Sequence, residues 1–203
     1  MLTVNPARNT ALDALLATHA ALCTAFPGVG PGVANEVTGG TYARQAITFG
    51  AAAAGVRTST NAPAFPVPAA TVAWIAFMTA ISGGSMLAAS PNNGNPKEFQ
   101  MSSVLANGIY LPAHGYTAGT TQITFYGGTP PTGLVEGTTY VVCNDGSMTA
   151  DAFKVAQVAT PTVPIVISGT PGTACVVSII QPEIFAAPGT FNLAIGATLN
   201  LNF

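Results

Sequence analysis

Charged side chains are scarce in this sequence. Lys and Arg together number 5 and Asp and Glu number 7 in 203 residues, so only 6% of the chain is charged, whereas roughly a quarter of a globular protein usually is. Lys and Glu are also the residues that subunit interfaces lack relative to free protein surfaces. We therefore expect other subunits to cover much of the surface.

No cluster of basic residues is present either. The formal net charge is −2 at pH 7 and the isoelectric point is about 5.5, whereas nucleic-acid-binding proteins neutralise phosphates with clustered Lys and Arg. This excludes nucleic acid as a partner. The low charge and the 49% hydrophobic content also argue against a disordered chain.

Cysteine is rare and widely spaced. Cys23, Cys143 and Cys175 are odd in number and form no Cys-x-x-Cys pair, which fits neither a disulfide framework nor a zinc site. We expect buried free thiols, with Cys143 and Cys175 as the only pairing to test. No metal or other cofactor is expected.

The sequence has no apolar run long enough to cross a membrane. Its most apolar stretch, residues 67–81, is interrupted by Pro68 and followed by two glycines, and it is shorter than the roughly 18 residues that a spanning helix needs. This favours a buried strand and no membrane insertion. The first residues lack the basic and apolar regions of a signal peptide, so we expect the protein to fold where it is made.

One short amphipathic helix is predicted near the N-terminus. Asn5 is a suitable N-cap and Pro6 suits the first helical position. The residues at helical spacing are Leu12, Leu15, Leu16 and His19. We expect His19 to pack at the edge of this stripe rather than bind a ligand, and the first strand to begin over residues 22–26.

The rest of the chain shows the alternation and turn residues of β structure. From residue 40 to 49, one face of a predicted strand carries Tyr42, Arg44, Ala46 and Thr48. Further strands are predicted over residues 58–64, 71–79 and 85–89. Residues 191–203 alternate again, and this closing strand needs a sheet to complete.

Residues 101–181 differ in sequence pattern from the flanking segments and are predicted to form an inserted all-β domain. Their short apolar runs are separated by Gly, Pro and Asn turns, of which Asn144-Asp145-Gly146-Ser147 is the clearest. The predicted strands cover residues 108–111, 122–126, 138–143, 152–158, 165–168 and 174–180. Residues 1–100 and 182–203 together would then form a second, discontinuous β-domain.

Several segments resemble parts of bacteriophage structural proteins. Residues 111–115, 128–134, 136–142 and 151–155 resemble a small β-module found repeatedly in such proteins. The most specific motif is Glu36-Val37-Thr38-Gly39-Gly40-Thr41-Tyr42-Ala43-Arg44-Gln45. With the N-terminal helix and residues 71–76 and 82–87, this motif resembles a family of phage virion proteins described as minor tail, tail-fibre or head-decoration proteins. The resemblance covers residues 8–90 and the closing strand, and the long insertion departs from the simpler members.

The resemblance implies an all-β fold, a jelly-roll-like β-sandwich with a short N-terminal helix, and a structural role without cofactor or catalytic residues. It places the protein in the virion, assembled in the cytoplasm of the bacterial host. A minor tail protein is the favoured interpretation, with a capsid decoration or head-fibre protein as the alternative. The expected partners are further copies of the chain, preferably in a trimer, and other virion proteins of the tail or capsid.

Glu36 and Arg44 are the charges that most need an explanation in so neutral a chain. A salt bridge between them would hold the loop of residues 35–41 against the following strand. Alternatively both groups are solvated, since exposed ion pairs contribute only about 0–1 kcal/mol, or they contact another subunit. The candidate residues for assembly or loop pinning are Glu36, Tyr42, Arg44 and Gln45.

An enzyme is the weakest of the interpretations considered. His19 and His114 are far apart in the sequence, and no Gly-x-Ser-x-Gly motif appears. Glu136, Asp145 and Asp151 could form the carboxylate pair of a polysaccharide-degrading enzyme, but capping of turns explains them better.

A glycan-binding insert is more plausible than an enzyme. The tyrosines that could offer aromatic platforms to a sugar are Tyr110, Tyr116, Tyr126 and Tyr140. In this interpretation the insert is an adhesin for a host surface glycan. Packing of most of these rings in a core is the competing explanation.

Overall fold

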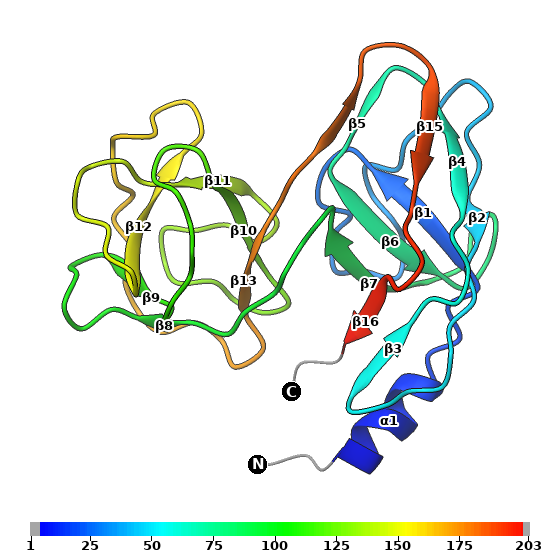
Figure 1. The fold of residues 1–203 in the computed structure, drawn as a ribbon, viewed down its shortest axis with the longest axis horizontal. Helices are drawn as coiled ribbons and strands as arrows, with labels where there is room; N and C mark the ends of the chain where they lie inside the picture. The colour runs from blue at the N-terminus through cyan, green and yellow to red at the C-terminus, as the bar shows by residue number, and fades with distance from the viewer. Residues whose placement is uncertain (1–4, 201–203) are drawn as a thin grey trace. The chain divides into compact units, whose positions relative to one another are not determined.

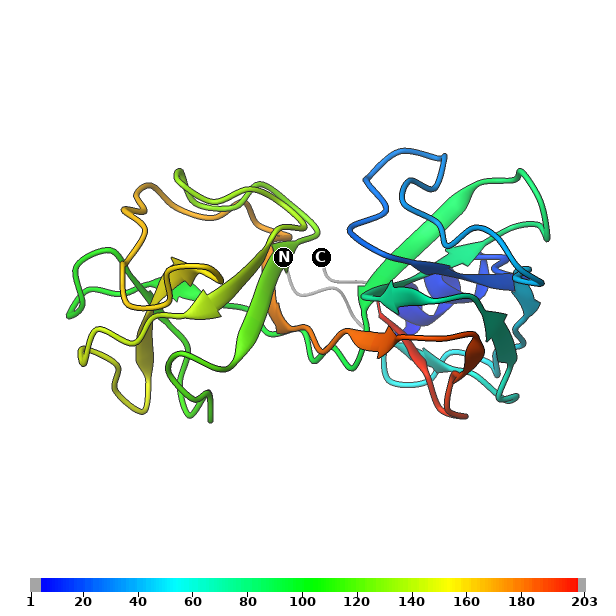
Figure 2. The ribbon, with the colours of Figure 1, turned by 90° about the horizontal axis from the view of Figure 1, so that it is seen from above.

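The computed structural model describes residues 5–200 and divides the chain into two compact units (Figure 1). The first unit comprises Met1–Asn92 and Pro182–Phe203, and the second comprises Asn93–Gln181. The chain passes between them twice, in the segments drawn green and orange (Figure 2). The regular secondary structure of the described residues is mostly β-strand with one short helix, and all the strand pairs are antiparallel.

The first unit contains the helix and ten strands, three of which come from the end of the chain. They are α1 (Asn5–Asp13), β1 (His19–Cys23), β2 (Gln45–Ala46), β3 (Val56–Thr58), β4 (Ala64–Val67), β5 (Ala70–Val72), β6 (Trp74–Met78), β7 (Met86–Pro91), β14 (Glu183–Phe185), β15 (Gly189–Asn192) and β16 (Thr198–Asn200). A four-stranded sheet has the order β2-β1-β6-β7, and the pairs β3–β16, β4–β15 and β5–β14 form two-stranded sheets. The red and orange strands therefore return to strands of the first half of the chain (Figure 1).

Both ends of the chain contribute to the core of the first unit. Leu12 from α1, Leu22 from β1, Phe65 from β4 and Phe191 from β15 belong to one buried cluster. The rings of Phe65 and Phe191 lie edge to face, with centroids 6.1 Å apart. The hydrophobic contact across β4 and β15 therefore joins segments that are far apart in the sequence.

The N-terminal helix begins where the sequence predicts but ends earlier. It stops at Asp13, so the prediction that the helical stripe extends to His19 is wrong. His19 instead begins β1, which also corrects the strand expected over residues 22–26. The cause is long-range pairing: all five residues of β1 lie opposite residues of β6, from His19 opposite Met78 to Cys23 opposite Trp74.

Strand alternation overestimates the strands that follow. Residues 40–49, predicted as one strand, contain only the short β2, because the chain turns at Gly39 and Gly40 with φ of 96° and 60°. Such angles suit glycine, which has no Cβ. Residues 58–64 are likewise not one strand but mostly connect β3 to β4.

Two longer predicted strands are each divided in the structure. Residues 71–79 form the end of β5 and all of β6, separated at Ala73, because β5 pairs with β14 whereas β6 pairs with β1 and β7. The closing strand expected over residues 191–203 is divided into β15 and β16. Its last three residues lie outside the described part of the chain. The strand predicted over residues 85–89 is confirmed as β7.

The second unit is a six-stranded antiparallel sheet around its own core. Its strands are β8 (Gln100–Met101), β9 (Gly108–Tyr110), β10 (Gln122–Tyr126), β11 (Thr139–Val142), β12 (Ala152–Gln157) and β13 (Val176–Ile179), in the order β13-β10-β11-β12-β9-β8. Five of the six strands predicted there from sequence are confirmed. Residues 165–168 are not a strand: Ser168 forms only an isolated bridge, to Thr132. The chain enters and leaves the unit side by side, because Lys97 is bridged to Val177.

Candidate functional site

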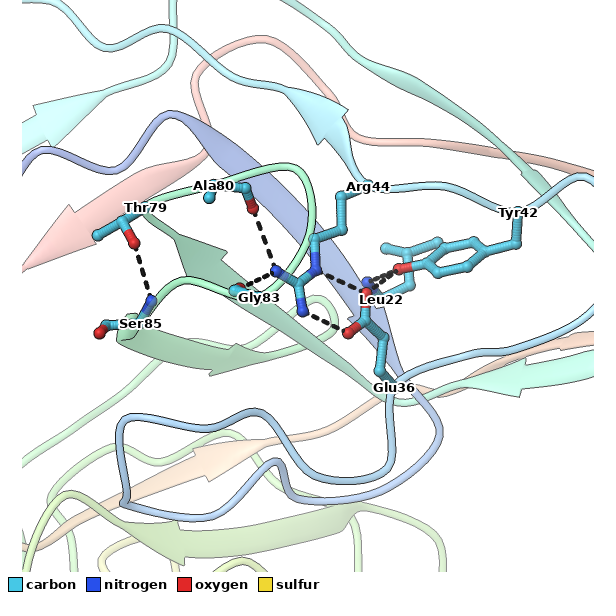
Figure 3. Close-up of polar contacts among 8 residues, drawn as sticks. All are labelled: Leu22, Glu36, Tyr42, Arg44, Thr79, Ala80, Gly83 and Ser85. Carbon is cyan, nitrogen blue, oxygen red and sulfur yellow. Dashed lines mark hydrogen bonds and ion pairs between the residues drawn. The ribbon is translucent and has the colours of Figure 1, made fainter.

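Glu36 and Arg44 form a largely buried, two-point ion pair in the first unit (Figure 3). The Arg44 Nε–H donates to Glu36 Oε1 at 2.8 Å, and Nη2 donates to Oε2 at 2.7 Å. The Glu36 side chain is only 19% exposed and the Arg44 side chain only 8%. Parallel charge-assisted hydrogen bonds of this kind fix the relative geometry of the two groups. The alternative in which both groups are solvated is therefore wrong.

The third nitrogen of the Arg44 guanidinium holds a second segment of chain. Nη1 donates to the carbonyl oxygens of Ala80 at 3.1 Å and Gly83 at 2.6 Å, both in the loop between β6 and β7 (Figure 3). The guanidinium thus joins the Glu36 carboxylate to the β6–β7 loop, defined as residues 79–85. No sequence pattern marks these two acceptors, because every residue has a backbone carbonyl.

The strand β1 positions both partners of the ion pair. Glu36 lies opposite Cys23 in an isolated antiparallel bridge. Arg44 directly precedes β2, whose Gln45 pairs with Ala20 of β1. The turn through the two glycines at positions 39 and 40 reverses the chain between these two contacts, so the side chains of Glu36 and Arg44 meet beside β1.

Tyr42 completes this cluster, whereas Gln45 does not join it. The Tyr42 hydroxyl accepts from the Leu22 N–H at 2.8 Å and donates to Glu36 Oε1 at 3.3 Å. Burial raises the pKa of this hydroxyl above its ordinary value, although the Leu22 amide opposes the shift. The hydrogen bonds that Arg44 donates to Glu36 raise the pKa of Arg44, so its guanidinium stays protonated. The Gln45 amide donates to the Ala43 carbonyl at 3.0 Å instead.

Apolar side chains are exposed on the loops beside this cluster. Ile81, within the β6–β7 loop, is 60% exposed, and Val29, in the loop of residues 27–34, is 78% exposed. The Met86 N–H, at the start of β7, donates to the Pro31 carbonyl at 2.7 Å and so joins the loop of residues 27–34 to the strand that follows the β6–β7 loop. The buried ion pair therefore fixes the shape of a surface that presents hydrophobic residues and no charge.

Other ion pairs neutralise more of the few charges within the chain. Arg57 Nε lies 3.7 Å from Asp13 Oδ1, and Lys154 Nζ lies 2.8 Å from Asp145 Oδ2. The hydrogen bonds from Lys154 and then Ser147 lower the pKa of Asp145 to about 2. With Arg44, three of the 5 basic residues are thus bound to carboxylates of the same chain.

The four tyrosines proposed as a glycan platform do not share one environment. Tyr140 is 2% exposed and its hydroxyl accepts from the Val135 N–H at 2.8 Å, so it is a core residue and offers no platform. Tyr110 is 38% exposed on β9, and Tyr126 is half-buried at the end of β10. Tyr116 is half-buried and lines a pocket.

The residues considered for catalysis have structural uses. Asp145 Oδ1 accepts from the Ser147 N–H at 3.0 Å, as an Asx-turn requires. Glu136 accepts from the Gly127 N–H at 2.9 Å, and Asp151 accepts from the Ala113 N–H at 2.8 Å. All three carboxylates therefore hold turns, in agreement with the interpretation preferred from sequence.

His19 and His114 belong to different units. His19 Nδ1 lies 2.9 Å from the Thr18 hydroxyl. The Tyr116 N–H donates to His114 Nδ1, and His114 Nε2 lies 2.9 Å from the Thr149 carbonyl oxygen. Within residues 5–200, no three His, Cys, Asp or Glu residues are grouped as metal ligands would be.

The three cysteines are free and buried, as expected, and the Cys143–Cys175 pairing is not present. Burial raises the pKa of Cys23 to about 12 and that of Cys175 to about 11, and it also raises that of Cys143. Because the thiolate is the reactive form, we predict that a disulfide reagent labels no cysteine in the native protein at mildly alkaline pH. All 3 should react in denaturant. Rapid labelling of any one of them under native conditions would contradict this prediction.

The chain matches a known protein family. A family model described as Podophage GP4 fiber I protein gp80 matches residues 4–109, just over half of the chain. The match includes the whole Glu36–Arg44 cluster and extends into the second unit as far as β9. No curated protein and no solved structure matches the chain. In the described part of the chain, the helix is too short to cross a membrane.

Proposed function

Because the chain belongs to the podophage GP4 fiber I protein family, we propose that it is a fibre subunit that assembles through uncharged surfaces of its first unit. Membership makes the protein a structural component of a bacteriophage virion. A fibre protein of this kind has a structural rather than a catalytic role. The expectation of a phage virion protein is therefore confirmed at the level of a fibre protein.

The assembly proposal rests on the burial and the hydrogen bonds of the Arg44 guanidinium. In a chain with only 5 basic residues, this guanidinium is buried and binds one carboxylate and two loop carbonyls. The guanidinium therefore holds the β6–β7 loop in one conformation and is not available to keep the surface hydrated. A defined loop with an exposed Ile81 suits contact with another protein, because apolar groups fill the centres of subunit interfaces and charged residues are depleted there.

The proposed partners are further copies of the chain and other virion proteins. We favour a homotrimer within a tail fibre, which would make this a minor tail protein, by analogy with phage fibres. A closed symmetric ring of copies would bury equivalent loops around its axis. A jelly-roll-like arrangement of the first unit and an outward-projecting second unit remain part of this proposal.

Replacing Ile81 with aspartate should weaken assembly without unfolding the protein. The side chain is 60% exposed, so the change costs little in the isolated subunit, whereas an unpaired charge buried in an interface is expensive. We expect the mass measured by light scattering to fall from that of an oligomer toward that of a monomer.

Val104→Asp is the matched control for this experiment. Val104 is 83% exposed but lies in the second unit, so its replacement should leave the mass unchanged. A wild-type chain that stays monomeric at high concentration would contradict the proposal. Labelled copies imaged on intact particles would distinguish a tail fibre from a head fibre or capsid decoration.

A further inference from the structure

The second unit contains a pocket whose wall combines a cation, an aromatic ring and neutral polar groups. Its volume is about 250 Å³, close to the lower end of the range of roughly 300–1,000 Å³ that is usual for ligand pockets. Lys97, Tyr116, Asn95, Thr121 and Gln181 contribute to the wall, and no acidic residue does. A pocket of this size suits a ligand no larger than about one sugar ring.

Lys97 is the only lysine in the described chain without a carboxylate partner. The other lysine, Lys154, is paired with Asp145. The backbone of Lys97 is fixed, because its N–H and carbonyl both form hydrogen bonds with Val177, at 2.8 and 3.0 Å. Its Nζ lies 5.9 Å from the centroid of the Tyr116 ring. The bridge to Val177 thus places Lys97 beside the pocket, where its ammonium can bind an anion.

The Tyr116 ring is positioned by packing. Its centroid lies 5.4 Å from that of Phe153 in an edge-to-face contact, and 5.0 Å from that of His114. The hydroxyl is buried and makes no hydrogen bond, so polar contacts do not set the orientation of the ring. The His114 side chain in turn accepts from the Tyr116 N–H. The aromatic wall is therefore formed before any ligand arrives.

The remaining polar groups suit hydroxyl groups of a ligand. The side-chain amide of Asn95, which lines the pocket, carries both donor and acceptor groups, as a sugar hydroxyl does. Thr121 Oγ1 accepts from the Thr117 N–H at 2.8 Å, which leaves its own proton for a further acceptor. Neutral groups of this type and one cation together match a hydroxylated ring that carries one negative charge.

We propose that this pocket binds a single acidic sugar unit of a larger glycan. The ammonium of Lys97 contacts the acidic group, the C–H face of the sugar lies against the Tyr116 ring, and the Asn95 amide and the Thr121 hydroxyl contact ring hydroxyls. A carboxylate and a phosphate ester both supply the required anion. This goes beyond fibre assembly, because it gives the second unit a ligand of its own.

Saturation-transfer NMR on the ligand tests this proposal with the full-length protein, whether assembled or not. The probes are glucuronate, glucose 6-phosphate, glucose and inorganic phosphate. Saturation transfer detects the three sugars, and inorganic phosphate is tested by its ability to displace them. We expect transfer to the ring C–H groups of at least one acidic sugar. Glucose should bind roughly tenfold more weakly, because it lacks the charged acceptor for the Lys97 ammonium. Inorganic phosphate should also bind roughly tenfold more weakly, because it lacks the ring that contacts Tyr116.

Two pairs of variants assign the binding to the pocket. Lys97→Gln should weaken binding of the acidic sugar by about tenfold or more, whereas Lys154→Gln, on the same unit, should not. Tyr116→Leu should abolish the transfer, whereas Tyr116→Phe should retain it, because the missing hydroxyl makes no hydrogen bond. The retained melting temperature of each variant checks that the unit is still folded.

Each result supports or overturns the proposal. Binding of glucuronate alone or of glucose 6-phosphate alone supports it and identifies the acidic group. Equal binding of glucose overturns it, as does displacement by inorganic phosphate as strong as that by glucose 6-phosphate, or the absence of any transfer. Lys97→Gln leaves the loops of the first unit unchanged, so the measured mass of the oligomer tests fibre assembly independently.

Discussion

Replacing Arg44 with methionine is expected to lower the free energy of unfolding by about 3–5 kcal/mol, as observed when one partner of a buried ion pair is removed. The Glu36 carboxylate, which is 19% exposed, would lose the guanidinium that binds both of its oxygens. The carbonyls of Ala80 and Gly83 would also lose their donor. Equilibrium denaturation measures this, because the single tryptophan, Trp74, is buried in the first unit and reports on it by fluorescence.

A double variant separates the ion pair from its surroundings. Arg44→Met combined with Glu36→Leu removes both charges, so it should be more stable than Arg44→Met alone, and the cycle gives the coupling energy. Lys154→Met is the comparison variant, because Lys154 binds Asp145 through one hydrogen bond, whereas Arg44 makes two to Glu36 and two more to loop carbonyls, so the loss of Lys154 should cost clearly less than that of Arg44. A loss below about 1 kcal/mol in Arg44→Met would show that the pair does not stabilise the first unit.

Phe191→Ala is expected to destabilise the first unit by about 3–5 kcal/mol, the usual cost of truncating a buried aromatic side chain. Phe191 is 2% exposed on β15 and packs on Phe65 of β4. The cavity left by the missing ring would weaken the packing of β15 against β4, the strand with which it pairs. The tryptophan signal should therefore change at lower denaturant concentration than in the wild type.

The second unit should be unaffected by this change if the two units unfold independently. Its reporters are tyrosines, since four of the 5 tyrosines of the chain lie there. Thr190→Ala is the matched control, because Thr190 precedes Phe191 on the same strand but is exposed. Simultaneous loss of the tryptophan and tyrosine signals in Phe191→Ala would show that the units unfold as one and would count against separate domains.

Local patterns predicted the second unit better than the first. Residues 122–126 were predicted and found as β10, with the same bounds. The sequential neighbours β10, β11 and β12 pair with one another, so turn residues between short apolar runs are enough to define them. The strand predicted over residues 165–168 does not form, because Ser168 makes only an isolated bridge, to Thr132.

The first unit is dominated by pairings between distant parts of the chain, which periodicity does not reveal. Nothing local marks Ala73 as the point where one apolar stretch changes from pairing with β14 to pairing with β1. The helical spacing of His19 likewise does not reveal that this residue pairs with β6 as part of a strand. Tertiary pairing overrides local propensity in both places.

The candidate site was partly predictable because charge is so rare. Glu36, Tyr42 and Arg44 were selected from the sequence, and the structure joins them in one cluster, whereas Gln45 stands apart. Their role in assembly stays a proposal. Lys97 was not selected, although it ends a long stretch without charge. Its proximity to Tyr116 depends on a bridge to Val177, which is distant in the sequence.

The sequence by itself determined the β class, the buried thiols, the absence of a basic surface and the kinship with phage virion proteins, because composition and short motifs carry that information. Only the tertiary structure decided which strands pair, that Arg44 holds the β6–β7 loop, and that a lysine and a tyrosine meet in one pocket. The reason is physical: these contacts join groups far apart along the chain, and their energies are realised only once the backbone has brought them together.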